Sequence, residues 1–287
     1  MNLSTTGLSL AADAAIDLQL HTNLSDGLWL PEQLLDYLVG EQFGLVALTD
    51  HDRVDTAVSL QKLALNKQIP VLVATEMTCE WRGSITDILC FGFDPQDKVL
   101  NQLTQDLLHR QQGNAREAYE NLQRKGYLPH EPPGGLTAVL AKPSAQQPHH
   151  LFALIQSQHE GMDDATTWQI MVDSGSRLMT NEVAAVVEAV QQSGGVCLIA
   201  HPGRQDGFVT YDDQLLDEIR REVPLDGLEV YYPAHTPEQT SLYLDYAQRH
   251  DWLISAGSDS HSPDKPPVKY RAELARKLLE RLGVQVG

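Results

Sequence analysis

Cysteine is scarce in this chain of 287 residues. It occurs only three times, as Cys79, Cys90 and Cys197, and this odd number and wide spacing exclude a dense disulfide framework and a Cys-x-x-Cys zinc site. Each cysteine lies in an apolar stretch. We therefore expect three small, buried side chains.

Basic side chains are also few. Lysine and arginine number 21 against 39 aspartates and glutamates, which gives a formal net charge of −18. Because such a surface repels long nucleic acids, we expect no stable complex with DNA or RNA. A small phosphorylated substrate is compatible with this charge, since bound metal ions reverse the field locally.

Long apolar runs are missing as well. No segment approaches the roughly 18 apolar residues of a membrane helix, and the opening residues 1–15 lack the basic region of a signal peptide. We expect a cytoplasmic protein without membrane contact. The sequence contains neither a G-x-S-x-G nucleophile elbow nor a P-loop. Hydrolysis by a serine nucleophile and P-loop phosphate chemistry therefore lack support. No stretch indicates an oligomeric state.

Short apolar strands alternate with amphipathic helices in both flanks of the chain. This alternation predicts a parallel sheet or barrel covered by helices. The predicted strands are 15–20, 45–49, 70–75, 85–93, 194–201, 227–232 and 252–259, and the predicted helices are 31–42, 54–66, 182–193, 211–222, 237–250 and 271–282.

The middle of the chain breaks this alternation. A long polar helix is predicted over 100–126, followed by a Pro/Gly-rich stretch over 128–150 and helical patterns at 151–158 and 163–172. We interpret this part as a helical insertion that forms a cap or lid. The predicted division is a barrel from 1–97 and 178–287 with a helical domain from 98–177.

Histidine and acidic side chains gather where the predicted strands end. In a parallel barrel these ends open on one face, so the side chains are expected to converge there as ligands of catalytic divalent metals. A lone histidine is more often a surface residue and a lone aspartate often a helix cap, so the joint placement is the signal. The residues are His21, Asp26, Asp50, His51, Asp52, Glu76, Asp87, His201, Glu229, Asp259 and His261.

The same segments resemble the ordered motifs of the PHP (polymerase and histidinol phosphatase) family. They are IDLQLHTNLSDG, LVALTDHD, VATEMT, AHPGR, DGLEVYYP and AGSDSH. GGVCLIAHPGR followed by DGLEVYYPAHTPEQ is similar to the branch of stand-alone phosphoesterases, which includes enzymes similar to a 3′,5′-nucleotide bisphosphate phosphatase, with related action on RNA 5′ ends. The resemblance implies a distorted TIM-like (β/α)7 barrel with a helical insertion, which itself matches only loosely.

The resemblance also implies a cluster of two or three divalent metal ions. Each ion would be held by one group of residues. The first group is His21, Glu76 and Asp259, with Gln19 at a further ligand position; the second is Glu76, His201 and Asp87; the third is Asp26, His51 and His261.

Gln19 and Asp87 depart from the family pattern, which has histidine at both positions. Both changes replace nitrogen donors by oxygen donors, a direction that favours Mn²⁺ or Mg²⁺ over Zn²⁺. We expect Mn²⁺, with Mg²⁺, Fe and Zn²⁺ left open, and weak binding of the ion beside Gln19.

A phosphate group also needs cationic ligands. Arg204 resembles the family's phosphate-binding arginine, and its planar fork suits phosphate oxygens. His235 is a candidate for binding phosphate or assisting the leaving group, with a surface role equally open. Gln147 stands where the family has an arginine. The weaker candidates in the insertion are Arg110, Arg116, Lys142 and His149.

The leading hypothesis is a metal-dependent phosphoesterase, a phosphatase or phosphodiesterase that uses metal-activated water on a nucleotide or oligonucleotide end. A second is a degenerate PHP protein that binds metal or ligand without turnover, for which Gln19 and Asp87 argue. A third is an amidohydrolase-like enzyme acting on carbon–nitrogen or ester bonds, since fold does not fix function. Metal-dependent turnover separates the first two.

Overall fold

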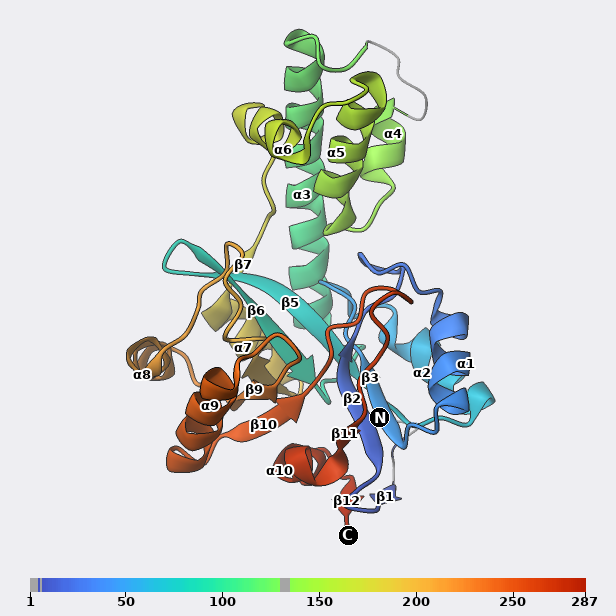
Figure 1. Cartoon of the computed structure of the whole chain (residues 1–287), viewed down its shortest axis with the longest axis vertical. Coiled ribbons are helices and arrows are strands. Elements are labelled where there is room, and N and C mark those ends of the chain that lie inside the picture. Colours follow the sequence, from blue (N-terminus) through green and yellow to red (C-terminus); the bar gives the residue numbers. More distant parts are fainter. Residues whose placement is uncertain (1–4, 6, 130–134) are drawn as a thin grey trace. The chain divides into compact units, whose positions relative to one another are not determined.

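The computed structural model describes residues 5, 7–129 and 135–287 of a mixed α/β chain. Two compact units are formed, one from Met1–Leu103 with Asn181–Gly287 and one from Thr104–Thr180 (Figure 1). The second unit begins six residues after the start of the insertion predicted at 98–177 and ends three residues after its predicted end. Its role as a cap or lid stays a prediction.

The strands of the first unit form three sheets. A six-stranded sheet has the order β10-β9-β8-β6-β5-β7, with strands Leu253–Ala256, Gly227–Tyr231, Val196–Ile199, Ser84–Phe91, Ala74–Trp81 and Asn181–Glu182. A four-stranded sheet has the order β11-β2-β3-β4, with strands Tyr270–Arg271, Ala15–Leu20, Leu45–Leu48 and Val71–Leu72. The short strands β1 and β12 pair with each other, Ser9–Leu10 with Gln285–Val286.

Within the described ranges no ladder closes a sheet on itself. The two larger sheets nevertheless meet at isolated parallel bridges, Leu20 with Ser260 and His51 with Glu76. They also share one apolar core, which contains Leu18 of β2 and Leu198 of β8. The strand ends that carry the candidate ligands are therefore brought together from both sheets.

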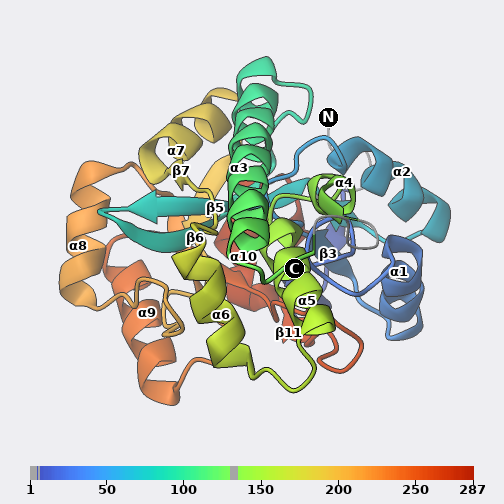
Figure 2. The ribbon, with the colours of Figure 1, turned by 90° about the horizontal axis from the view of Figure 1, so that it is seen from above.

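Helices surround the strands of the first unit, as the view in Figure 2 shows. The six-stranded sheet packs on one group of helices and the four-stranded sheet on another, through separate apolar clusters. The helices are α1 (Pro31–Gly40), α2 (Ala57–Lys67), α7 (Val183–Gln192), α8 (Asp213–Glu222), α9 (Pro237–Arg249) and α10 (Arg276–Arg281), the last preceded by the 3-10 turn Ala272–Ala275.

Local sequence explains where several helices begin. In α9, Thr236 and Gln239 form a reciprocal capping box and Pro237 occupies the first turn. In α8, Asp212 accepts a hydrogen bond from the backbone N–H of Leu215. These caps confirm the predicted positions of both helices to within about two residues.

Two strands depart from the parallel pattern: β6, and the short β11, which pairs antiparallel with β2. Strands β5 and β6 form an antiparallel hairpin, and β6 also runs antiparallel to β8. Arg82 and Gly83 both have positive φ, 52° and 79°, which is the conformation of a two-residue hairpin turn. The expectation of a wholly parallel sheet is therefore wrong at β6, because this turn returns the chain beside β5 without a crossover helix.

The second unit is helical. It contains most of α3 (Lys98–Arg124), together with α4 (Gly135–Leu140), α5 (Gln146–Gln158) and α6 (Asp164–Asp173), around a small apolar core. The Pro/Gly-rich stretch predicted at 128–150 thus holds α4 and the first turn of α5, while 130–134 lie outside the described residues. Among the helices that are described, none combines the length and apolar character of a membrane span.

Candidate metal centre

Three overlapping groups of side chains have ligand atoms within 4.8 Å of one another. They lie just beyond the ends of β2, β3 and β10 and within β5 and β6. The groups are His21, Asp26, His51 and His261; His21, Glu76 and Asp259; and His51, Glu76 and Asp87. The structure therefore brings together seven of the predicted ligands, and His201 joins them through Glu76 and Asp87.

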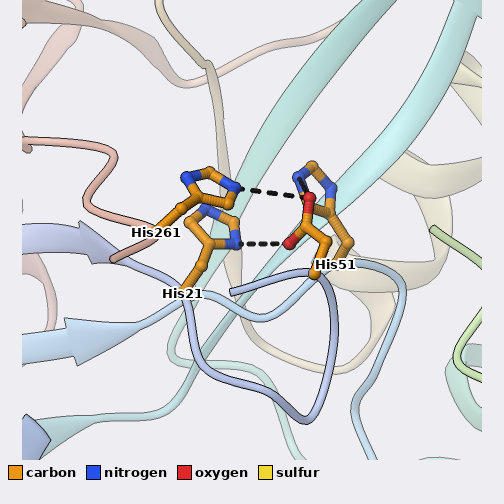
Figure 3. A group of neighbouring side chains, drawn as sticks. His21, His51 and His261 are labelled. Atoms are coloured by element: carbon orange, nitrogen blue, oxygen red, sulfur yellow. Dashed lines mark ion pairs between the residues drawn. The ribbon is translucent and has the colours of Figure 1, made fainter. Parts of the chain in front are cut away.

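Three histidines surround Asp26. Its carboxylate oxygens lie 3.6 Å from His21 Nδ1, 3.7 Å from His51 Nε2 and 3.3 Å from His261 Nε2. The rings of His21 and His261 stack with centroids 4.1 Å apart, and His51 faces them (Figure 3). Burial alone would raise the pKa of Asp26, but the three imidazoles hold that pKa far below its ordinary value. Three imidazoles and one carboxylate thus converge from three connections, those that follow β2, β3 and β10.

Glu76 lies between two histidines. Its Oε2 is 2.9 Å from His21 Nε2, and its Oε1 is 3.0 Å from His201 Nε2. Asp259 Oδ1 is 3.2 Å from the same His21 nitrogen. Burial opposes ionisation of Glu76, yet His51, His201 and His21 keep the pKa of its carboxyl well below the ordinary range. Each oxygen of Glu76 faces a different imidazole, as a carboxylate that bridges two ions would.

Gln19 and Asp87 lie on either side of Glu76. Gln19 donates from Nε2 to Glu76 Oε2 at 2.9 Å, and its buried Oε1 has no hydrogen-bond partner among the described residues. Asp87 Oδ2 is 3.6 Å from His201 Nε2, and Oδ1 is likewise unpaired in the part of the chain described. Burial, and next Glu76, raise the pKa of Asp87 well above its ordinary value.

These orphaned oxygens test whether metal ions fit. Buried polar atoms are nearly always hydrogen-bonded, so unpaired carboxyl and amide oxygens beside imidazoles mark places where a cation would complete the bonding. The donor set of imidazole and carboxylate is the one used by divalent catalytic metals. The residues present therefore fit divalent ions.

Arg204 is paired with a neighbouring acid. Its Nε and Nη2 donate to Asp206 at 2.6 and 3.0 Å, and its guanidinium lies over the Phe208 ring at 4.1 Å. Burial opposes its charge, but Asp206, together with Asp259 and Asp87, raises the pKa of Arg204 above its ordinary value. The arginine is thus charged and lies within electrostatic reach of the cluster.

His235 has both ring nitrogens engaged. Nδ1 lies 3.0 Å from Val230 O, and Nε2 accepts from Gly203 N at 3.1 Å. Burial, and a smaller effect of His201, lower the pKa of His235 to about 4, so the ring is neutral. A direct phosphate contact, as predicted, would require His235 to give up its bond to Gly203.

The candidates in the insertion belong to the second unit. Arg110 Nη1 donates to Thr180 O at 2.7 Å, and the exposed His149 packs edge-on against Trp168 with centroids 5.6 Å apart. The buried Gln147 donates to Lys142 O at 2.9 Å. Arg116 is exposed. Phosphate binding by Arg110, Arg116, Lys142 and His149 stays a prediction.

Sequence reasoning missed the part played by two buried acids. Asp17 accepts backbone hydrogen bonds from Ser258 and Val268, both at 2.9 Å. Asp50 accepts at 2.7 Å from Thr22 N, beside His21. An aspartate within an apolar strand such as 15–20 is the signal that could have indicated the first of them.

Several known proteins are similar to the chain, although no family profile matches it. A 3′,5′-nucleoside bisphosphate phosphatase of Chromobacterium violaceum is 26% identical over 257 residues, covering 87% of this chain and 88% of the relative. The 5′-3′ exoribonuclease Rnm of Salmonella typhimurium is 27% identical over 281 residues, covering 94% and 91%.

Solved structures share the fold. A structure described as a metal-dependent phosphoesterase of Bifidobacterium adolescentis has a TM-score of 0.77 at 23% identity and covers 96% of this chain and 97% of its own. One described as an amidohydrolase of Chromobacterium violaceum, with bound sulfate, has a TM-score of 0.75 at 22% identity, covering 93% and 97%. At such identities the likeness establishes the fold alone.

Proposed function

We propose that this chain, a PHP-type phosphoesterase in line with the relatives named above, hydrolyses a phosphate ester of a small nucleotide or an oligonucleotide end with two or three divalent metal ions. The relatives confirm the resemblance that the motifs indicated. We further propose that the reaction takes place in the cytoplasm, the compartment expected from the sequence. The proposal is independent of any oligomeric state.

The observation that carries the proposal is the position of Glu76 between His21 and His201. A buried carboxylate with one oxygen on each of two histidines, at 2.9 and 3.0 Å, suits two neighbouring cations. Such ions, when bound, lower the pKa of water and stabilise charge that develops on phosphoryl oxygens. Arg204 would bind and orient the phosphate, since its charge is held close to Asp87 and Asp259.

We propose Mn²⁺ as the resident metal. The oxygen donors Gln19 and Asp87 support a hard or borderline cation over Zn²⁺. Gln19 Oε1, which has no hydrogen-bond partner among the residues that the structure describes, is a neutral oxygen ligand and binds a cation more weakly than imidazole does.

Gln19→His is expected to raise the amount of Mn²⁺ that the protein retains. An imidazole in place of the amide strengthens the ligand set, and changes of this kind shift metal affinity by roughly 10–100-fold. Metal content after dialysis, measured together with turnover, tests this. Gln61→His, at a buried glutamine of α2 outside the metal groups, is the control. A fall in metal content would mean that the amide is the better partner for Glu76.

We propose that seven strands act together as a distorted barrel: β2, β3, β5, β6, β8, β9 and β10. The bridges Leu20–Ser260 and His51–Glu76 support this arrangement because they connect β2 with the segment after β10, and the segment after β3 with β5. The closure supplies a physical reason for the convergence of ligands, since strand ends around a barrel meet at one mouth.

Arg204→Met is expected to raise KM for a phosphorylated substrate by about 10–100-fold, because a hydrogen bond to a charged group is lost. Steady-state kinetics on the full chain would measure this. Arg82→Met is the matched control, since Arg82 pairs with Glu218 and Glu222 on α8 and belongs to no candidate site. An unchanged KM would remove Arg204 from the phosphate site.

The decisive experiment is phosphate release from a panel of nucleotide mono- and bisphosphates and short 5′-phosphorylated RNA. Purified protein is assayed with Mn²⁺, with a chelator control and with metal content measured on the same sample. Release that the chelator abolishes supports the proposal and ranks the substrates. Protein that holds metal but releases no phosphate would favour binding without turnover, or hydrolysis of a non-phosphate bond.

A further inference from the structure

Four buried carboxylates lie behind the metal centre and belong to none of the three metal groups: Asp17, Asp50, Asp52 and Glu229. We call them the outer carboxylates. Each accepts a hydrogen bond from a backbone N–H, and in each case that N–H lies in or close to a segment that carries a predicted ligand. The helix-cap role that a lone acidic residue often has does not describe these contacts.

Glu229 makes the most direct contact of this kind. It is fully buried in β9, and its Oε2 accepts from the backbone N–H of His201 at 3.0 Å. Its Oε1 has no hydrogen-bond partner within the described residues. His201 has a positive φ of 26°, a conformation that costs energy in a non-glycine residue and persists where neighbouring groups fix it. The bond from Glu229 fixes the backbone from which the imidazole reaches Glu76.

Asp17 fixes the backbone of the segment that carries Asp259 and His261. Its Oδ1 accepts from Ser258 N and its Oδ2 from Val268 N, each at 2.9 Å. Ser258 directly precedes Asp259, which also has a positive φ, of 55°. The two bonds hold both ends of the loop that carries Asp259 and His261 against β2.

Asp50 and Asp52 act on the remaining segments. Asp50 Oδ1 accepts from Thr22 N at 2.7 Å and from Ser25 Oγ at 2.8 Å, residues that adjoin His21 and Asp26. Asp52, with a φ of 55°, accepts from Thr78 N at 2.9 Å, two residues beyond Glu76 on β5. Three of the four outer carboxylates are thus associated with a non-glycine residue of positive φ. For Glu229 it is His201, which donates the hydrogen bond; for Asp17 it is Asp259, next to the donor Ser258; and Asp52 has a positive φ itself.

We propose that the outer carboxylates are positioning residues, which hold the strained backbone of the ligand-bearing segments so that the imidazoles and carboxylates are arranged for metal before the ion arrives. The inference rests on the metal centre of the proposed function, though not on its reaction. Glu229 serves as the test case because it makes a single hydrogen bond, to the backbone N–H of one predicted ligand, His201.

The test compares two substitutions of Glu229 in the full chain. Glu229→Gln keeps an oxygen that accepts from His201 N, whereas Glu229→Met keeps the volume and removes the acceptor. After chelation and dialysis, Mn²⁺ is titrated and bound metal is measured by equilibrium dialysis, without substrate. We expect Glu229→Met to bind Mn²⁺ about 10–100-fold more weakly and Glu229→Gln to bind like the parent chain.

The structure offers a matched control at the other end of the same two strands. Asp226 Oδ2 accepts from the backbone N–H of Cys197 at 2.9 Å, at the start of β8 and away from the ligands. Asp226→Leu is expected to lower the melting temperature while leaving Mn²⁺ affinity unchanged. If Glu229→Met binds Mn²⁺ like the parent, or if Asp226→Leu weakens binding equally, the proposal is overturned.

Asp17→Asn covers the case in which Glu229→Met does not fold. An asparagine has only one oxygen, so it must lose either Ser258 N or Val268 N, and we expect weaker Mn²⁺ binding from a folded protein. Unchanged binding there would overturn the proposal. A parent chain that binds no divalent metal overturns both this inference and the proposed function, whereas tight metal binding without phosphate release would contradict the proposed function alone.

Discussion

Glu76→Gln should abolish turnover, with a fall in kcat on the order of 10³-fold or more, since the change removes both a charge and a donor from the centre. Glu76 is fully buried and contacts His21 and His201 with separate oxygens. The amide group keeps the shape but offers one neutral oxygen and one N–H group. An N–H directed at either histidine would occupy the place of a cation.

The measurement is the kcat of the variant with saturating Mn²⁺, together with its metal content and melting temperature. Glu80→Gln is a suitable control, because Glu80 lies on the same strand and belongs to none of the metal groups. We expect the control to keep parent activity. A Glu76→Gln protein that is folded and fully active would remove Glu76 from the reaction and end the bridging assignment.

The sequence was sufficient to predict the parts of the fold that depend on local patterns. Apolar strands ending in His21, His201 or Asp259 were recognisable because burial and a polar terminus are both encoded within a few residues. The convergence of these ends was predictable as well, since it follows from the geometry of parallel strands. In the structure the ligand atoms of His21, Glu76 and Asp259 lie within 4.8 Å of one another.

The rest depends on contacts between distant segments. The direction of β6 was set by the turn at Arg82 and Gly83, whose signal is weak beside the surrounding apolar run. The two bonds of His235, to Val230 O and Gly203 N, follow from the approach of separate loops. No periodicity in the sequence encodes such an approach, so a phosphate contact and a structural contact were indistinguishable for His235 before the fold was known.

The pairing of Arg204 with Asp206 illustrates the same limit at short range. The two residues are close in sequence, but only the turn after β8 directs the guanidinium fork onto this carboxylate. Arg204, the predicted phosphate-binding residue, is therefore already paired with the carboxylate of Asp206. A substrate phosphate would compete with Asp206 for the fork, which makes the strength of this exposed pair relevant to KM.

Removal of metal should have the second large effect, on stability as well as activity. The centre holds the carboxylates of Asp26, Glu76, Asp87 and Asp259 close together, and the burial of Asp87 beside Glu76 already disfavours its ionised form. Divalent cations would offset this repulsion in the folded state only. At a free Mn²⁺ concentration of 100 times Kd, the linkage contributes about 2.7 kcal/mol to the free energy of unfolding for one site.

Thermal unfolding of the chelated protein, followed by titration with Mn²⁺, measures this contribution. We expect the melting temperature to rise with Mn²⁺ concentration and activity to return over the same range. In Glu76→Gln the rise should be smaller, because a carboxylate shared by two groups is lost, whereas Glu80→Gln should respond like the parent. A melting temperature that does not depend on Mn²⁺ would mean that the buried carboxylates are neutralised by the histidines alone. The contacts of Glu76 with His21 and His201 would then have a structural role and would not form a metal site.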